Sequence, residues 1–315
     1  MTRPTVLMPS PMHDVVVDGC EERFELIRLW EAADRDALLT ERGPEVRGLA
    51  LGGHARVDAA LLDRLPNLQI VANFGVGYDS VDVDAATERG VIVTNSPGVL
   101  DDEVADTALA LLLMTVRELG QAERYLRAGR WAAEGPYPLT DLTMTGRKLG
   151  ILGLGRIGEA IAKRAETFRM TVGYHNRSRK DAPYRYYPSL LEMARDVDTL
   201  LVVVPGNAAT RHLVGAEVLE ALGPDGVLVN IGRGTVVDEA ALIGALKTRT
   251  IRAAGLDVYE DEPNVPQELI DLDNAVLLPH VGSASKATRR AMGQLVIDNL
   301  TSWFAEGRAL TPVNG

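Results

Sequence analysis

Short apolar segments alternate with amphipathic, helix-like segments along the whole chain. In the first third, strands are expected at residues 5–8, 46–51, 69–72 and 91–94, with helical patterns at residues 21–30 and 59–65 between them. A chain that alternates strands and helices in this way is typical of an α/β protein with parallel sheets.

The alternation is interrupted once and then resumes. Residues 101–128 show a single helical period that opens on acidic residues and ends before Gly129, so this segment is a candidate connector between domains. Beyond Pro138, strands are expected at residues 148–152, 171–174, 199–204, 226–231, 251–256 and 275–278. Six strands with helices between them fit a complete doubly wound sheet. The last helical pattern, residues 286–305, precedes no strand, and we expect it to return to the first domain.

These patterns predict two domains, of which the first is discontinuous. Residues 1–99 and 284–315 are expected to form a substrate-binding domain, and residues 100–283 a dinucleotide-binding domain inserted into it. A chain of 315 residues, 46% of them hydrophobic, is long enough to bury two medium-sized cores.

Charge and cysteine content narrow the class of protein. The formal net charge of -11 argues against a nucleic-acid-binding protein, which needs a basic face. Cys20 is the only cysteine, so no intramolecular disulfide can form, and a reducing cytoplasm is the expected compartment. The most apolar segment, residues 108–116, is far shorter than the about 20 residues that span a bilayer, and the N-terminus lacks the apolar stretch of a signal peptide. We therefore expect neither nucleic acid nor membrane as a partner, and no metal site.

A glycine pattern marks a candidate nucleotide site. Gly153, Gly155 and Gly158 have G-x-G-x-x-G spacing, with Arg156 and Ile157 inside the pattern. The pattern follows an apolar strand and opens a helix, a context in which glycines permit a tight turn and free backbone amides meet a pyrophosphate. The alternative is a glycine-rich turn that only packs a helix on a sheet.

The end of the next strand indicates which cofactor is used. An NAD site normally places an acidic residue about 20 positions further on, where it binds the ribose 2′-hydroxyl. Here the strand is followed by Asn176, Arg177, Ser178 and Arg179, and the first carboxylate beyond them is Asp181. These groups suit a 2′-phosphate, which favours NADPH over NADH. The alternative is an exposed basic loop, with Asp181 reaching back to the ribose.

Three polar residues, Arg233, Glu262 and His280, follow strand-like segments downstream of the glycine pattern. Each alone has a structural explanation: Arg233 can tie down a loop, Glu262 can cap a turn, and His280 can be a capped histidine beyond a buried strand. Their shared place at the carboxyl ends of parallel strands, where ligands bind, favours a catalytic set. As an imidazolium, His280 would donate a proton, Glu262 would favour its charged form, and Arg233 would pair with a substrate carboxylate. This is the chemistry needed to reduce a 2-keto acid.

In this order, the glycine pattern and these three residues resemble the D-isomer-specific 2-hydroxyacid dehydrogenase family, over essentially the whole chain. The resemblance implies two Rossmann- or flavodoxin-like doubly wound parallel-sheet domains with the active site in a cleft between them. It also implies a homodimer formed through the cofactor domain.

The resemblance implies further site residues. Residues 73–79 look like the family's substrate loop, in which the backbone amides of Val76 and Gly77 would hold the substrate carboxylate, with Gly52 nearby. Asp257 would bond the carboxamide of the nicotinamide. The implied cofactor contacts beyond the glycine turn are Thr107, Val204, Pro205, Thr210, Ile231, Asp257 and Gly282.

Within the family, residues 174–179 and 309–313 most resemble the NADPH-using glyoxylate and hydroxypyruvate reductases. A dehydrogenase for another 2-keto acid, D-lactate-like or longer, stays open because small changes in loop packing redirect substrate preference. A non-enzymatic, nucleotide-sensing co-repressor is a further alternative on the same fold. Tyr137, which stands between two prolines, would either reach across a dimer interface into the partner's active site or pack at that interface.

Overall fold

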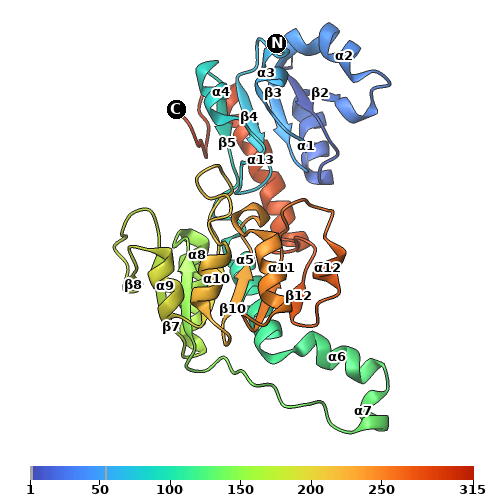
Figure 1. Ribbon diagram of the computed structural model, residues 1–315. Helices are drawn as coiled ribbons and strands as arrows, with labels where there is room; N and C mark the ends of the chain where they lie inside the picture. Colours follow the sequence, from blue (N-terminus) through green and yellow to red (C-terminus); the bar gives the residue numbers. More distant parts are fainter. Residues whose placement is uncertain (1–2, 54) are drawn as a thin grey trace. The chain divides into compact units, whose positions relative to one another are not determined.

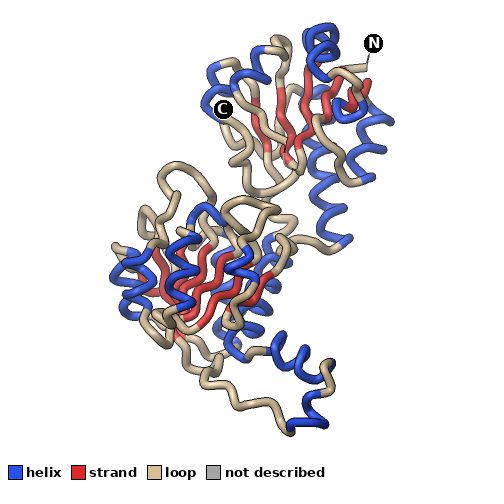
Figure 2. Tube along the Cα trace, turned by 45° about the vertical axis from the view of Figure 1, so that its right-hand side comes forward, coloured by secondary structure: helices blue, strands red, loops and turns tan. Residues whose placement is uncertain are grey.

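The computed structural model describes residues 3–53 and 55–315. The chain divides into two compact units, a first unit of Met1–Leu100 with Ser285–Gly315 and a second unit of Asp101–Ala284. In both units, helices cover the two faces of a parallel sheet (Figures 1 and 2). The predicted fold class, two parallel-sheet α/β units, is confirmed.

The first unit contains a five-stranded parallel sheet in the order β2-β1-β3-β4-β5. Its strands are β1 (Thr5–Met8), β2 (Glu25–Arg28), β3 (Val46–Leu51), β4 (Ile70–Asn73) and β5 (Ile92–Thr94). Its helices are α1 (Asp14–Arg23), α2 (Arg35–Arg42), α3 (Ala59–Asp63), α4 (Val83–Glu88) and α13 (Lys286–Glu306), with 3-10 turns η1 (Leu29–Glu31) and η2 (Gly43–Glu45).

Neighbouring residues of the central strands enter different cores in the first unit. Leu49 packs in a cluster with Leu62 of α3, whereas Ala50 packs in a second cluster with Val16 of α1 and Val296 of α13. Successive strand side chains point to opposite faces, so each of these central strands is buried on both sides. This double burial explains why the strands appear in the sequence as continuous apolar runs.

The prediction of a helix at residues 21–30 is wrong. Helix α1 ends at Arg23, and Glu25–Arg28 forms β2 at the sheet margin, in parallel register with β1. Ile27 is the one fully buried residue of this strand. A short edge strand with a single buried side chain shows almost no alternation of apolar and polar residues in its sequence. The charged residues on either side of it therefore resemble the exposed face of an amphipathic helix.

The second unit contains a seven-stranded parallel sheet in the order β12-β11-β10-β9-β6-β7-β8. Its strands are β6 (Lys148–Leu152), β7 (Thr171–His175), β8 (Arg185–Tyr186), β9 (Thr199–Val202), β10 (Val227–Asn230), β11 (Ala253–Leu256) and β12 (Ala275–Leu277). Its helices are α5 (Asp101–Arg117), α6 (Leu119–Arg127), α7 (Arg130–Glu134), α8 (Arg156–Thr167), α9 (Leu190–Asp196), α10 (Ala216–Leu222), α11 (Glu239–Lys247) and α12 (Gln267–Ile270), with the 3-10 turn η3 (Gly234–Val236).

This strand order is that of a doubly wound dinucleotide-binding sheet, and it reverses direction between β6 and β9. Helices α5 and α8 pack against each other on one face of the sheet, and α9, α10 and α11 pack in a row on the other (Figure 1). The strand β8 was not expected, because two residues are too few to show a hydrophobic period.

The single helix expected over residues 101–128 is two helices. Helix α5 ends at Arg117 and α6 begins at Leu119, and the backbone of Glu118 between them is left-handed, with φ 51°. A non-glycine residue in this conformation ends a right-handed helix. Helices α6 and α7 then lead away from the sheet of their own unit (Figure 1).

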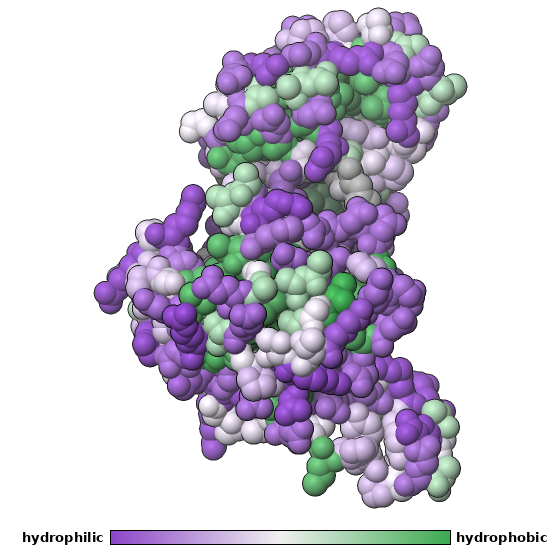
Figure 3. Space-filling view, in the orientation of Figure 1, coloured by the Kyte–Doolittle hydropathy of each residue, from purple (hydrophilic) through white to green (hydrophobic). Residues whose placement is uncertain are grey.

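Hydrophilic residues cover most of the face drawn in Figure 3, with small hydrophobic patches between them. Among the described residues, no helix is both long and apolar enough to cross a membrane. The same residues contain no group of three or more His, Cys, Asp or Glu side chains that could hold a metal ion.

Candidate active site

Six loops leave the carboxyl ends of strands in the second unit and carry most of the residues that the sequence singled out. They follow β6, β7, β9, β10, β11 and β12. Because the strands are parallel, these loops emerge at the same end of the sheet. Open α/β sheets bind ligands at this end, where the strand order reverses.

In the glycine turn after β6, two glycines lie so close to neighbouring atoms that neither position has room for a side chain. Gly153 has φ 107°, and a Cβ there would lie 2.7 Å from Val204 Cγ1. A Cβ on Gly158 would lie 2.4 Å from the carbonyl oxygen of Gly153, so the turn requires glycine at both positions. Gly155 is the N-cap of α8, has no side-chain cap and has open space where its Cβ would be. An uncapped helix N-terminus of this kind fits the pyrophosphate of a dinucleotide.

Arg156 and Ile157 form the first turn of α8. The Arg156 side chain is largely exposed, and its Nε lies 3.3 Å from Asp101 Oδ2 at the start of α5. Ile157 is partly buried. The guanidinium therefore stands beside the uncapped helix end, where it can reach an anion bound there.

The residues after β7 have two different environments. Asn176 Oδ1 accepts a hydrogen bond of 2.7 Å from the Leu154 amide, and its Nδ2 donates to the Leu154 carbonyl at 3.2 Å. Its side chain therefore braces the glycine turn, and its contact with a 2′-phosphate stays a prediction. Arg177, Ser178 and Arg179 are exposed, and they remain the groups available to a phosphate.

The loop after β9 is closed by its own hydrogen bonds. Thr210 Oγ1 donates to the Pro205 carbonyl at 2.8 Å and accepts from the Asn207 amide at 2.9 Å. Val204 lies against the glycine turn. Thr210 therefore shapes the loop rather than offering a free hydroxyl.

Asp257, after β11, is almost completely buried, at 1% exposure. Its Oδ1 accepts from the Val281 amide at 2.7 Å and its Oδ2 from the Gly282 amide at 2.8 Å. Burial raises the pKa of Asp257, against the effect of these two backbone bonds. Thr107 Oγ1 donates to the Gly282 carbonyl at 3.3 Å, and Ile231 is buried. The structure thus brings Thr107, Asp257 and Gly282 into one bonded group.

Glu262 and His280 are in direct contact. Glu262 Oε2 lies 2.7 Å from His280 Nδ1, and Glu262 Oε1 accepts from the Tyr259 amide at 3.1 Å. Burial alone would raise the pKa of Glu262, but the hydrogen bond and charge of His280, with the charge of Arg233, hold that pKa below its usual range. Because Nδ1 is engaged, Nε2 is the ring nitrogen that can serve a substrate.

Arg233 is positioned by its own loop. Asn230, the last residue of β10, accepts from the Gly232 amide at 3.1 Å and donates to the Arg233 carbonyl at 3.0 Å. Arg233 Nη1 donates to the Gly232 carbonyl at 2.8 Å, and the side chain is partly buried. The charge of Arg233 acts on Glu262, so the structure places all three predicted catalytic residues in one electrostatic group.

Two residues that the sequence analysis missed hold this group together. A Cβ on Gly234 would lie 1.8 Å from the carbonyl carbon of Tyr259, so glycine alone allows the loop after β11 to pack on the loop that carries Arg233. The Tyr259 hydroxyl donates to the Leu278 carbonyl at 2.9 Å, two residues before His280. Gly234 has no side chain, and the Tyr259 hydroxyl is bonded to backbone carbonyls, so the only sequence signal was their place just beyond strands.

In the first unit, the loop after β4 presents backbone amides. Asn73 Nδ2 donates to the carbonyls of Gly75 at 3.2 Å and Gly77 at 2.8 Å, and Asn95 Nδ2 donates to the Val76 carbonyl at 2.9 Å. Among the hydrogen bonds of residues 3–53 and 55–315, none uses the N–H of Val76 or Gly77. Successive N–H groups left open in a turn can bind an anion, so anion binding at this turn stays a prediction. The two asparagines were not predicted, although side-chain amides beside a glycine-rich turn are a usable signal.

Gly52, after β3, is buried, and its carbonyl accepts from Ser10 Oγ at 2.7 Å. A Cβ on Gly52 would lie 2.9 Å from Met12 Cε. Gly52 therefore permits close packing between the loops after β1 and β3.

Tyr137 is held within its own chain. Its hydroxyl donates to Glu118 Oε2 at 2.9 Å, and its ring packs edge-on against Tyr125 with centroids 5.4 Å apart. Burial and the bond to Glu118 raise the pKa of Tyr137 to about 12. A role in a partner's active site stays a prediction.

A sequence model of the "D-isomer specific 2-hydroxyacid dehydrogenase, NAD binding domain" matches residues 109–282. The chain belongs to this dehydrogenase family.

Whole-length relatives extend the match to both units. Glyoxylate/hydroxypyruvate reductase A of Arabidopsis thaliana is 45% identical over 98% of each chain, and hydroxyphenylpyruvate reductase of Plectranthus scutellarioides is 45% identical with the same coverage. The crystal structure of an NADPH-dependent glyoxylate/hydroxypyruvate reductase of Sinorhizobium meliloti in complex with NADP and malonate is 53% identical, with a TM-score of 0.94 over 99% of this chain and 97% of that one. This member of the dehydrogenase family is therefore an oxidoreductase with a nicotinamide cofactor. The predicted enzyme class is confirmed, and the co-repressor alternative has no support among these relatives.

Proposed function

We propose that this dehydrogenase uses NADPH to reduce a small 2-keto acid, glyoxylate or hydroxypyruvate, to the 2-hydroxy acid, which has the D configuration when the substrate is hydroxypyruvate. The observation that carries the proposal is the 2.7 Å contact between Glu262 Oε2 and His280 Nδ1, at the same end of the sheet as the glycine turn. A carboxylate-backed imidazole is a proton donor, and the nicotinamide cofactor supplies the hydride when it is bound.

His280 donates its Nε2 proton to the keto oxygen as that oxygen becomes a hydroxyl. Glu262 accepts the Nδ1–H and favours the imidazolium form, and its low pKa keeps it a carboxylate at neutral pH. A positioned general acid typically accelerates such a step by about 10²–10⁴-fold.

Arg233 binds the substrate carboxylate and polarises the keto oxygen, because its planar guanidinium can donate to two oxygens at once. The N–H groups of Val76 and Gly77 also bind the carboxylate, because neither N–H donates to another group among the described residues.

The preference for NADPH rests on the exposed Arg177, Ser178 and Arg179 after β7, where an NAD site would carry an acid. The Sinorhizobium meliloti relative is described as NADPH-dependent and was crystallised with NADP, which supports the same preference. We further propose that Asp257 uses a remaining lone pair for the carboxamide of the nicotinamide, since each of its oxygens has accepted one backbone bond.

The substrate is the least constrained part of the proposal. Relatives named for glyoxylate and hydroxypyruvate support a small 2-keto acid. The hydroxyphenylpyruvate reductase, equally similar in sequence, supports a longer side chain as the second candidate.

The loss of nicotinamide absorbance tests the proposal, with NADPH or NADH and with glyoxylate, hydroxypyruvate, pyruvate or hydroxyphenylpyruvate as the acceptor. Fast oxidation of NADPH by glyoxylate or hydroxypyruvate is expected. Faster turnover with NADH would overturn the cofactor assignment, and faster turnover with hydroxyphenylpyruvate would overturn the substrate assignment.

We also propose a homodimer formed through the second unit. The side chains of Leu119, Leu126, Trp131 and Leu139, on α6, α7 and the following loop, are 43%, 55%, 60% and 98% exposed. Exposed apolar side chains gathered on one segment mark a surface that another chain covers. Sedimentation equilibrium should show a dimer that the double change Leu126→Asp, Trp131→Asp dissociates, whereas Ile270→Asp, at a similarly exposed position on α12, should leave it intact.

A further inference from the structure

The loop after β7 carries the groups that the proposed function assigns to a 2′-phosphate, and these groups make no bonds within the chain. Arg177, Ser178 and Arg179 are exposed. Within residues 3–53 and 55–315, none of the three takes part in a hydrogen bond or an ion pair, through its backbone or its side chain. A segment without bonds of its own keeps one arrangement only if its ends are fixed.

The first end of this segment is fixed by Asn176. Its side chain accepts from the Leu154 amide at 2.7 Å and donates to the Leu154 carbonyl at 3.2 Å. Leu154 lies inside the glycine turn. This attachment therefore sets the start of the loop relative to the turn that is expected to hold the pyrophosphate.

The second end is fixed by the hydroxyl of Tyr174, the next-to-last residue of β7. The hydroxyl accepts from the Lys180 N–H at 2.8 Å and donates to the Lys180 carbonyl at 3.0 Å, across six positions of the chain. One side chain thus bonds both backbone groups of a single residue and closes the segment between them into a loop. Arg177, Ser178 and Arg179 lie between the two fixed ends.

The Tyr174 ring is itself held firmly. The side chain is completely buried, at 0% exposure. In the sheet, Tyr174 lies between Ile151 of β6 and Tyr186 of β8, and its ring contacts that of Tyr186 with centroids 5.4 Å apart. A ring packed in this way stays in one rotamer, so its hydroxyl is a fixed point at the end of β7.

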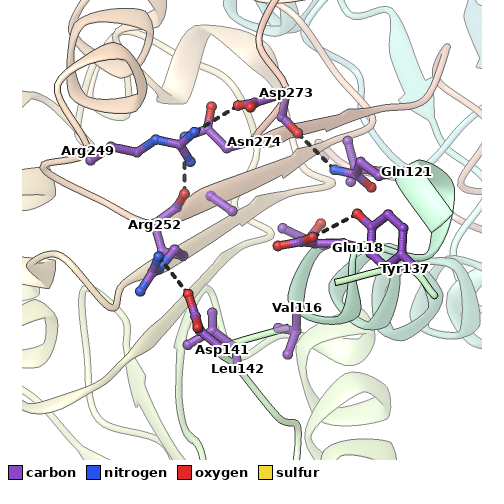
Figure 4. Close-up of a pocket in the computed structure, with 13 residues that line it drawn as sticks. Val116, Glu118, Gln121, Tyr137, Asp141, Leu142, Arg249, Arg252, Asp273 and Asn274 are labelled. Carbon is purple, nitrogen blue, oxygen red and sulfur yellow. Dashed lines mark hydrogen bonds and ion pairs between the residues drawn. The ribbon is translucent and has the colours of Figure 1, made fainter. Parts of the chain in front are cut away.

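Two other tyrosine hydroxyls of the second unit show what is different about Tyr174. The Tyr137 hydroxyl bonds to the Glu118 carboxylate at 2.9 Å (Figure 4), and the Tyr187 hydroxyl bonds to the Asp196 carboxylate at 2.6 Å. Each of these bonds joins two side chains. The bonds of the Tyr174 hydroxyl instead act on the backbone of a loop that carries candidate cofactor contacts.

We propose that Tyr174 is a positioning residue for the 2′-phosphate of NADPH, because its hydroxyl fixes Lys180 so that Arg177 and Arg179 lie where the phosphate binds. Without the hydroxyl, the N–H and carbonyl of Lys180 would turn outward to bond with water, and Arg179 would move with them. NADH has no phosphate at this position, so its binding does not depend on the arrangement of the loop. The inference rests on the proposed function in one respect, the use of NADPH.

Tyr174→Phe tests the inference, because it removes the hydroxyl and keeps the ring. The Michaelis constants for NADPH and NADH are measured with glyoxylate or hydroxypyruvate as the acceptor. We expect KM for NADPH to rise about tenfold, the value of an ordinary hydrogen bond or two, and KM for NADH to stay within about twofold. Tyr187→Phe, the matched control, removes the bond to Asp196 and should change neither constant. Equal rises in both constants, or a rise in neither, would overturn the inference.

A combined variant shows whether Tyr174 acts through the two arginines. When Arg177 and Arg179 are both alanine, adding Tyr174→Phe should leave the ratio of the two Michaelis constants unchanged, because the groups that it positions are absent. A ratio that still changes would mean that the hydroxyl acts by another route, and would contradict the inference.

Hydrogen exchange resolved to single amides tests the same bonds in the unmodified protein, and so remains informative if Tyr174→Phe does not fold. The Lys180 amide should exchange more slowly than the amides of Arg177 and Arg179. Equal rates at the three amides would overturn the inference. If the unmodified enzyme does not prefer NADPH, the cofactor assignment fails and the inference fails with it. If the enzyme prefers NADPH and Tyr174→Phe keeps that preference, the inference fails and the proposed function stands.

Discussion

Replacing Glu262 with glutamine removes the negative charge of the side chain and keeps its size. The carboxylate accepts from His280 Nδ1 at 2.7 Å and from the Tyr259 amide at 3.1 Å, and the side chain is 23% exposed. Glutamine is almost the same size and still offers one oxygen as an acceptor. The substitution therefore removes the negative charge that favours a protonated His280, while most of the local packing is kept.

The size of the effect follows from the bond that changes. A hydrogen bond to a charged group contributes about 1.5–3 kcal/mol, which corresponds to about 10- to 150-fold in rate if it acts on the proton-transfer step. We expect Glu262→Gln to lower kcat for glyoxylate reduction with NADPH by this factor. Steady-state rates at saturating glyoxylate and NADPH measure this change.

Stability provides a second readout with a fixed sign. The pKa of Glu262 lies below its ordinary value of 4.5 in the folded protein, so its carboxylate stabilises the fold at neutral pH, and this contribution is lost as the pH falls through the folded-state pKa. Glu262→Gln should therefore remove part of the acid dependence of unfolding. Glu268→Gln, an exposed position on α12, is the matched control. A kcat within twofold of the unmodified enzyme would refute the reasoning.

The remaining predictions concern the other parts of the site. His280→Ala should lower kcat by about 10²–10⁴-fold, with NADPH binding measured by fluorescence nearly unchanged; loss of binding would make the residue structural. Changing Arg177 and Arg179 together to alanine should raise KM for NADPH far more than for NADH, and equal effects would exclude contact with a 2′-phosphate. Gly158→Ala places a Cβ 2.4 Å from the Gly153 carbonyl, so it should destabilise the fold by about 1–3 kcal/mol in chemical denaturation and weaken cofactor binding; an unaltered protein would contradict this close packing.

The sequence predicted those residues of the candidate site that directly follow strands. Arg233, Asp257 and His280 each follow an apolar strand, and parallel strands bring such positions to one end of the sheet whatever the details of packing. The glycine spacing was similarly informative, because close backbone approaches admit few other residues. What the sequence did not reveal is the support around these groups. Asn230 and Tyr259 act through bonds to backbone atoms, which many residues in many loops can make.

The sequence by itself determined the central strands of both sheets, because these strands are buried on both faces and must be continuously apolar. It also determined the order of the chemical groups along the chain. The tertiary structure alone decided the rest: β2 gains its strand conformation by pairing with β1, the helix beginning at Asp101 breaks at Glu118, and the Asn176 side chain bonds to the backbone of Leu154. These outcomes depend on partners that are distant in sequence or on a single backbone torsion, and a local hydrophobic pattern carries no information about either.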